Sequence, residues 1–121
     1  MLERDVERQC DALIEQHLGR VVRYSQPRAS KQSEGIADRE YFVLGAKIRF
    51  ECKRADGKLS QGQLELLTLE HLSGGIVCVG GVDELKHLLI ALRTGGDVAR
   101  SLGKLFLDLW AARGVRRKRA A

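Results

Sequence analysis

Two β-rich runs joined by a two-residue connection constrain the fold of this chain more than any other feature. The runs cover residues 39–44 and 47–54, and only Gly45-Ala46 lies between them. So short a connection predicts an antiparallel hairpin, because parallel strands need a crossover of about a dozen residues or more. The chain is therefore expected to contain a sheet built around this hairpin.

The second run alternates apolar and charged residues. Ile48, Phe50 and Cys52 occupy one set of alternate positions, and Glu51 and Lys53 belong to the other set. Successive side chains of a strand point to opposite faces of the sheet. Glu51 and Lys53 should therefore project from the same face.

A helix and a further strand are expected after the hairpin. Leucines make residues 60–72 apolar on most sides, and Gly74-Gly75 ends that helical pattern. The next run, residues 76–79, is continuously apolar, as is typical of a buried strand. A strand–helix–strand step needs a crossover, so the sheet should be mixed and flanked by helices.

Apolar periodicity predicts the remaining elements. A first helix is expected over about residues 4–18, a strand over 21–24, a loop over 25–35, and two final helices that begin near residues 83 and 97. The order is α-β-β-β-α-β followed by C-terminal helices, which defines an α/β fold. The last helix has an apolar stripe that favours core packing, with a subunit interface as the alternative: Val98, Leu102, Leu105, Phe106 and Leu109.

The length of 121 residues fits one domain, and the basic charge is concentrated at one end. The net charge is +5, and without five basic residues near the C-terminus sixteen basic residues balance sixteen acidic ones. We therefore expect a single domain over residues 1–112 and a basic tail over residues 113–121. Arginine-rich segments suit phosphate backbones, because each contact releases condensed counterions. The five residues are Arg113, Arg116, Arg117, Lys118 and Arg119.

Several classes of protein are not expected. No apolar run reaches the roughly 18 residues of a membrane span, and the charged start of the chain does not resemble a secretory signal, so a cytoplasmic location is expected. Cys10, Cys52 and Cys78 have wide, irregular spacing, which suggests neither a disulfide framework nor a zinc site. No organic cofactor is indicated.

Asp38, Glu51 and Lys53 form the clearest chemical pattern in the sequence. Two carboxylates can hold a hard cation such as Mg²⁺, which polarises a phosphoryl oxygen and lowers the pKa of a bound water. A lysine beside them can stabilise the charge that develops on the phosphate. On spacing alone the commoner interpretation of such a pattern is an ordinary salt bridge between Glu51 and Lys53 on a solvated sheet, and phosphodiester hydrolysis is the alternative.

The residues around this pattern resemble the VRR-NUC family, a compact branch of the PD-(D/E)XK nuclease superfamily. The resemblance covers roughly Glu7 to Leu89 and implies a restriction-endonuclease-like core. It departs from the family at Ala37, where proline is common and would stiffen the approach to the aspartate. The matching elements, in order, are Gly35-Ile36-Ala37-Asp38, the hydrophobic hairpin, Glu51-Cys52-Lys53-Arg54, Gly57, Leu59-Ser60, Gln63, Gly74-Gly75 and Ile76-Val77-Cys78-Val79.

The resemblance implies roles for particular residues. Asp38 matches the aspartate of the PD motif and Glu51 the acidic residue of the (D/E)XK element, so both would bind the metal. Lys53 would be the catalytic lysine, and the backbone carbonyl of Cys52 would complete the inner sphere. Gln63 matches a glutamine that supports the site and contacts phosphate.

Two further assignments have open alternatives. Glu7 matches an acidic residue that the first helix brings towards the metal, although it could instead be a first-turn acid that favours the helix dipole. Glu15 is the next candidate for that ligand. Gln63 could simply complete a capping box with Ser60.

The resemblance implies a homodimeric, structure-selective DNA endonuclease that uses Mg²⁺, with Mn²⁺ able to substitute, at Holliday or other branched junctions. Junction resolution needs two active sites, hence two copies of the chain. A phage origin, and so a host cytoplasm, would suit a protein of this kind. Expected DNA contacts are Arg23, Lys31, Arg116, Arg117, Lys118 and Arg119.

Three alternatives remain at this stage. The first is a monomeric nicking, flap or restriction-type nuclease. The second is a non-catalytic DNA-binding module, which the presence of all three central residues disfavours. The third is a soluble protein in which Glu51 and Lys53 form an ordinary ion pair and the basic tail binds something acidic.

Overall fold

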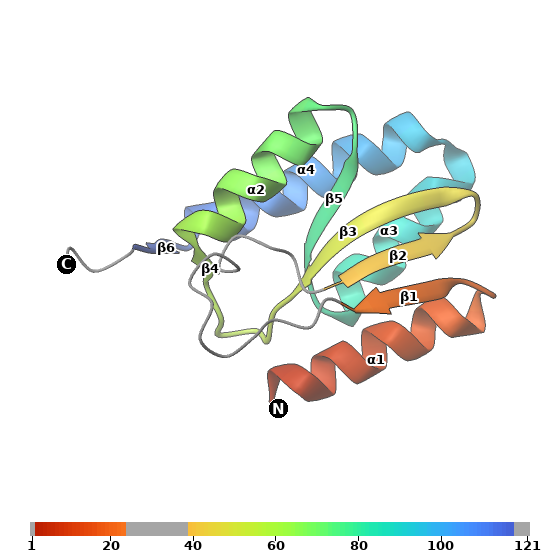
Figure 1. The fold of residues 1–121 in the computed structure, drawn as a ribbon, viewed down its shortest axis with the longest axis horizontal. Helices are drawn as coiled ribbons and strands as arrows, with labels where there is room; N and C mark the ends of the chain where they lie inside the picture. The colour runs from red at the N-terminus through yellow and green to blue at the C-terminus, as the bar shows by residue number, and fades with distance from the viewer. Residues whose placement is uncertain (1, 24–38, 118–121) are drawn as a thin grey trace.

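The computed structural model describes residues 2–23 and 39–117 of the chain, which form a mixed α/β domain (Figure 1). A central sheet is flanked by helices, as the sequence predicts. The elements in chain order are α1 (Glu3–Gln16), β1 (Arg20–Arg23), β2 (Arg39–Val43), β3 (Ala46–Cys52), β4 (Leu59–Ser60), α2 (Gln61–Leu72), β5 (Ile76–Gly80), α3 (Val82–Thr94), α4 (Gly96–Ala112) and β6 (Val115–Arg116).

The main sheet has four strands in the order β1-β2-β3-β5. The first three are antiparallel and β5 runs parallel to β3, so the predicted hairpin and the predicted mixed sheet are both confirmed. The hairpin turn lies one residue earlier than expected. Leu44 and Gly45 both have positive φ, at 52° and 76°, as a two-residue hairpin turn of the right twist requires.

The two faces of the sheet are covered by different helices. On one face, α1 and α3 pack on the alternate apolar residues of β3, and on the other, α2 and α4 pack on Val77 and Val79 of β5. Glu51 pairs in register with Val79, so it belongs to the face that α2 and α4 cover. Within the described ranges no helix has the length and apolar content to cross a membrane.

A second, two-stranded sheet was not expected from the sequence. In it β4 and β6 pair in parallel, with Leu59 opposite Val115 and Ser60 opposite Arg116. Arg113 is the C-cap residue of α4. Its guanidinium lies over the Trp110 ring and donates a hydrogen bond of 2.7 Å to the Ala55 carbonyl. The first residues of the predicted tail are thus packed against the domain.

The apolar stripe predicted for the last helix differs from the face that α4 buries. Val98, Leu105 and Leu109 are about half exposed, and Leu102 and Phe106 are partly buried. The residues that face the sheet are instead Ala99, Gly103, Leu107 and Trp110. Small residues let a helix backbone approach a strand closely, and a pattern based on large apolar side chains does not detect them.

The apolar residues Val6, Cys10, Ile14 and Leu18, at intervals of four residues, predict a core stripe for the first helix, and Leu18 departs from it. Leu18 lies beyond the end of α1, in the turn before β1, with a positive φ of 60° and a side chain that is 94% exposed. Val6, Cys10 and Ile14 of the same stripe are buried as expected.

Gly103 should be essential for the packing of α4 on β5. A Cβ atom at this position would lie 1.9 Å from the Val77 carbonyl oxygen, so the helix would have to move away from the strand. Gly103→Ala should lower the free energy of unfolding in urea by about 3 kcal/mol, the upper end of the usual cost of overpacking. Gly96→Ala in the same helix is the matched control, because no heavy atom lies within 4 Å of a Cβ there. Equal stability of the two variants would contradict this packing.

Candidate active site

Glu51 and Lys53 lie near the end of β3, on the same face, as the alternation of the strand predicts. Glu51 is 1% exposed and Lys53 is 5% exposed. The Lys53 Nζ atom lies 3.7 Å from Glu51 Oε1. That separation is an ion pair rather than a hydrogen bond, so the protons of the ammonium remain able to donate to a phosphate oxygen or a water molecule.

Gln63 joins this pair to the first turn of α2. Its Oε1 accepts a hydrogen bond of 2.9 Å from the Ser60 amide, and its Nε2 donates one of 2.8 Å to Glu51 Oε1. The Ser60 hydroxyl in turn accepts a hydrogen bond of 3.1 Å from the backbone amide of Gln63. The capping box and the contact with Glu51 were alternatives in the sequence, but both are formed, because the two ends of one amide group serve them separately.

Burial distinguishes this pair from the other ion pairs on the same face of the sheet. Lys47 and Arg49 make ion pairs with Glu40 and Glu70, and the Lys47 side chain is 49% exposed. Removing a carboxylate and an ammonium from water costs several kcal/mol for each ion, so a buried pair contributes little net stability. Net stability therefore does not by itself account for the burial of Glu51 and Lys53.

The Cys52 side chain points to the opposite face of β3 and is fully buried. A hydrogen bond with Cys10 and burial both raise the pKa of the Cys52 thiol well above its ordinary value. The thiol therefore stays protonated, and a protonated thiol is a poor metal ligand. This orientation leaves only the backbone carbonyl of Cys52 for the role that the family resemblance implies.

Glu7 contacts Arg39, which follows the predicted ligand Asp38 directly in the chain. Its Oε2 lies 3.2 Å from the Arg39 Nη2 atom. The first-turn acids of α1 are Glu3 and Asp5, so the alternative that Glu7 is a first-turn acid is wrong. Its predicted role as a metal ligand stays a prediction, since Asp38 lies outside the described residues.

Asp11 is a buried carboxylate that the sequence analysis missed. It is 4% exposed, and three side chains from two strands donate hydrogen bonds to it: Arg23, Arg39 and Tyr41. Burial raises the pKa of the Tyr41 phenol, which keeps it a donor. Burial alone would lower the pKa of Arg39, but its hydrogen bond to Asp11 and the charges of Asp11 and Glu7 raise it.

A signal for Asp11 was present in the sequence. Glu7, Asp11 and Ile14 follow one another at four- and three-residue intervals, which places both acids at the edge of the buried stripe of the first helix. An acid on such an edge needs a buried cation, and Arg39 at the start of a predicted strand could supply it.

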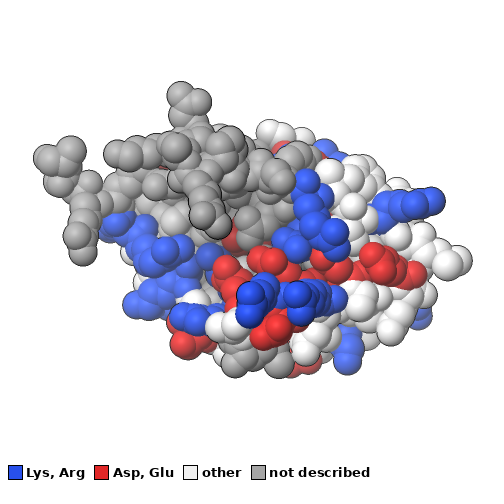
Figure 2. Space-filling view, turned by 60° about the horizontal axis from the view of Figure 1, so that its bottom comes forward, with Lys and Arg blue, Asp and Glu red and all other residues white. Residues whose placement is uncertain are grey.

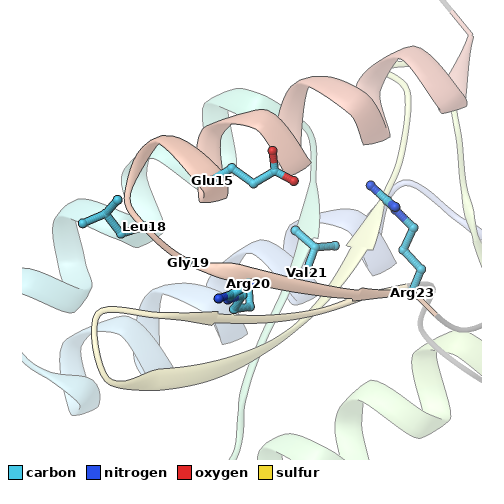
Figure 3. A pocket seen from close by; sticks show the side chains of 6 residues that line it. All are labelled: Glu15, Leu18, Gly19, Arg20, Val21 and Arg23. Carbon is cyan, nitrogen blue, oxygen red and sulfur yellow. The ribbon is translucent and has the colours of Figure 1, made fainter.

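Arg23, a predicted DNA contact, donates two hydrogen bonds to Asp11, of 3.1 and 2.9 Å, while its side chain stays 62% exposed. It shares a surface hollow with Glu15 and Arg20, between the end of α1 and β1 (Figure 3). Glu15 lies two turns, or about 12 Å, further along α1 than Glu7. The end of α1 leads into Arg20, which pairs with Phe42 beside the hairpin turn, so Glu15 is at the hairpin end of the sheet, whereas Glu51 lies at the other end of β3.

The remaining predicted site residues divide into two groups. Arg116 and Arg117 are described and exposed. Asp38, Lys31, Lys118 and Arg119 lie outside the described residues. Among the described residues no group of three or more His, Cys, Asp or Glu side chains could hold a metal ion. Glu51 and the Cys52 carbonyl supply the hard oxygen donors that Mg²⁺ prefers, and the fit of a metal is complete only with Asp38.

Asp11→Asn should destabilise the protein, because it removes the carboxylate charge beside the buried guanidinium of Arg39. We expect a loss of about 3 kcal/mol in the free energy of unfolding in urea, the usual cost of breaking a buried ion pair. Arg23→Ala is the control, because it removes the exposed partner of the same carboxylate and should cost less than about 1 kcal/mol. A wild-type urea midpoint for Asp11→Asn would show that the network contributes nothing.

A scan against protein-family models, a search of curated proteins and a search of solved structures each found no match to this chain. The resemblance to the VRR-NUC family therefore rests on the residues quoted above.

Proposed function

We propose that the chain is a metal-dependent DNA endonuclease with a restriction-endonuclease-like core. The observation that carries the proposal is the buried pair of Glu51 and Lys53 at the end of β3, held to the start of α2 by Gln63. The order of elements, from α1 through the three antiparallel strands and α2 to the parallel strand β5, is the order that the family resemblance implies.

Each residue of the site has a defined part in this proposal. Asp38, Glu51 and the Cys52 carbonyl would hold Mg²⁺ or Mn²⁺. The bound metal would neutralise charge on the phosphate and supply a water of lowered pKa. The Lys53 ammonium donates to the phosphate and stabilises the negative charge that develops during attack. Gln63 keeps the Glu51 carboxylate in one orientation through its 2.8 Å hydrogen bond.

Branched DNA, with a four-way junction as the first choice, is the proposed substrate. The basic residues that lie beyond the end of α4 add affinity for phosphate backbones whatever the base sequence. A monomeric nickase, flap nuclease or restriction-type enzyme is the second candidate, and the number of chains in the active species separates the two. A non-catalytic DNA-binding module is the third.

Lys53→Met and Glu51→Gln should each abolish most cleavage while DNA binding persists. Loss of a group that stabilises the transition state typically lowers the rate by a factor on the order of 100 or more. The assay follows the cleavage of labelled four-way junction, flap and linear duplex DNA with Mg²⁺ or Mn²⁺. Addition of EDTA should stop this cleavage. Lys47→Met is the matched control, because it removes a lysine from the same face of the same strand.

Two results would contradict the proposed function. One is full cleavage by Lys53→Met, and the other is cleavage by the unaltered protein in EDTA. If the unaltered protein binds the junction and cuts none of the substrates, a DNA-binding module is the better assignment.

A second copy of the chain is the proposed partner of α4. Val98, Leu102, Leu105 and Leu109 follow one another at intervals of four, three and four residues, the spacing of a helix–helix seam, and Leu102 also packs against the core. Three of these side chains are 46%, 52% and 54% exposed, which is unusual for so regular a stripe. A dimer of this kind would supply the two sites that symmetrical junction cleavage requires.

Leu105→Asp combined with Leu109→Asp should convert a dimer to a monomer, because the two carboxylates would be buried against each other in the seam. Sedimentation equilibrium gives the molar mass directly. Leu69→Asp with Leu72→Asp is the control, since it places the same charges on exposed leucines of α2. If the unaltered protein is a monomer at micromolar concentration and still cuts DNA, the monomeric nuclease is the correct alternative.

A further inference from the structure

We propose that the surface hollow beside Lys53 binds a second phosphodiester group of the DNA strand, next to the one that is cleaved. This inference rests on the proposed function and joins Arg116, which the sequence indicated as a DNA contact, to Lys58 and Arg54, which it did not indicate. The hollow is lined by four cations, Lys53, Arg54, Lys58 and Arg116, and by two carboxylates, Glu3 and Asp56. Its formal charge is therefore positive, which suits a phosphate ligand.

The small sheet of β4 and β6 builds this hollow from distant parts of the chain. Pairing of the two strands sets Arg116 opposite Ser60, and Lys58 directly precedes β4. The turn before β6 lies close to the end of the Lys58 side chain, because a Cβ atom on Gly114 would be 3.6 Å from Lys58 Nζ. The hydrogen bond from Arg113 to Ala55 holds the loop between β3 and β4 against the end of α4.

Two of the four cations are available for a ligand. Arg54 is partly neutralised by Asp56, whose Oδ1 atom lies 2.9 Å from its Nε. By contrast, Lys58 and Arg116 are exposed and form no ion pair with another residue of the described ranges. Basic atoms gather at this end of the molecule, where Figure 1 places β4 and β6, whereas acidic and basic atoms are mixed along the adjacent surface (Figure 2).

The hollow is connected to the proposed catalytic pair through two short routes. Lys53 lines the hollow and also lies 3.7 Å from Glu51. Ser60, the neighbour of Arg116 in the small sheet, forms the capping box with Gln63, which binds Glu51. A strand with one phosphate at Lys53 carries the next phosphates close by, because successive nucleotides rise only about 3.4 Å along a duplex axis.

The test is the salt dependence of DNA binding by the full chain with Lys58→Ala and Arg116→Ala combined. Binding of labelled duplex and junction DNA is measured by fluorescence anisotropy in EDTA, so that cleavage plays no part. Each lost phosphate contact should reduce the slope of log affinity against log salt by about 0.9, and the double variant loses the one phosphate of the hollow, so its slope should fall by about 0.9. The loss should be the same for both DNA structures, since phosphate contacts carry no sequence or shape preference.

Lys86→Ala combined with Arg93→Ala is the matched control. It also removes one lysine and one arginine, but from exposed positions of α3, which packs on the opposite face of the sheet. If both double variants change the slope equally, or if neither does, the hollow is not a phosphate subsite. If polyglutamate displaces the labelled DNA as effectively as unlabelled DNA does, the hollow binds acidic polymers in general, which would also overturn the proposal.

Cleavage kinetics separate this inference from the proposed function. In the double variant of the hollow, KM should rise while kcat is retained, because Lys53 and Glu51 are unchanged. If the unaltered protein cuts no DNA but the slope of the double variant still falls by about 0.9, the subsite stands and the nuclease assignment fails. If cleavage occurs and the double variant has unchanged KM and slope, the nuclease stands and the subsite fails.

Discussion

The side-chain amide of Gln63 is the contact on which the arrangement of the site depends. One end of the amide caps α2 through Ser60 and the other binds the buried carboxylate of β3. Because α2 is also the crossover that leads to β5, the same contact fixes where the helix begins above the sheet and where the parallel strand enters it. A carboxylate that accepts a strong hydrogen bond in a buried place keeps one orientation, and a site that binds a metal needs such a fixed ligand.

A second buried network fixes the other side of the sheet. Asp11 joins α1 to β1 and β2 through Arg23, Arg39 and Tyr41, while Glu7 binds Arg39 from one turn earlier in the helix. Arg39 is the first residue of β2 and pairs in register with Phe50, so the start of β2 is held from both the helix and the neighbouring strand. These contacts fix the position of Arg39, the residue that follows Asp38 in the chain.

Local periodicity was enough to predict the sheet and the common face of Glu51 and Lys53. A two-residue connection and a period of two residues determine a hairpin and its faces without reference to the rest of the chain. Long-range contacts could not be predicted in the same way. The face that α4 buries depends on the small size of Gly103 and Ala99, which lie beside β5. Asp11 can be buried because an arginine from a strand far along the chain donates a hydrogen bond to it. The strands β4 and β6 have two residues each, too few for any periodic signal.

The position of the small sheet links the fold to the proposed activity. Helix α1 contributes Glu3 to the hollow beside Lys53, and β6 contributes Arg116, so segments more than a hundred residues apart meet next to the end of β3. A paired sheet of only two residues per strand is weak by itself. In the proposed complex, a phosphate held by both Lys58 and Arg116 would link the residue before β4 to β6. The proposed DNA contact would therefore stabilise the pairing of β4 with β6, because a ligand that binds only the paired form stabilises it.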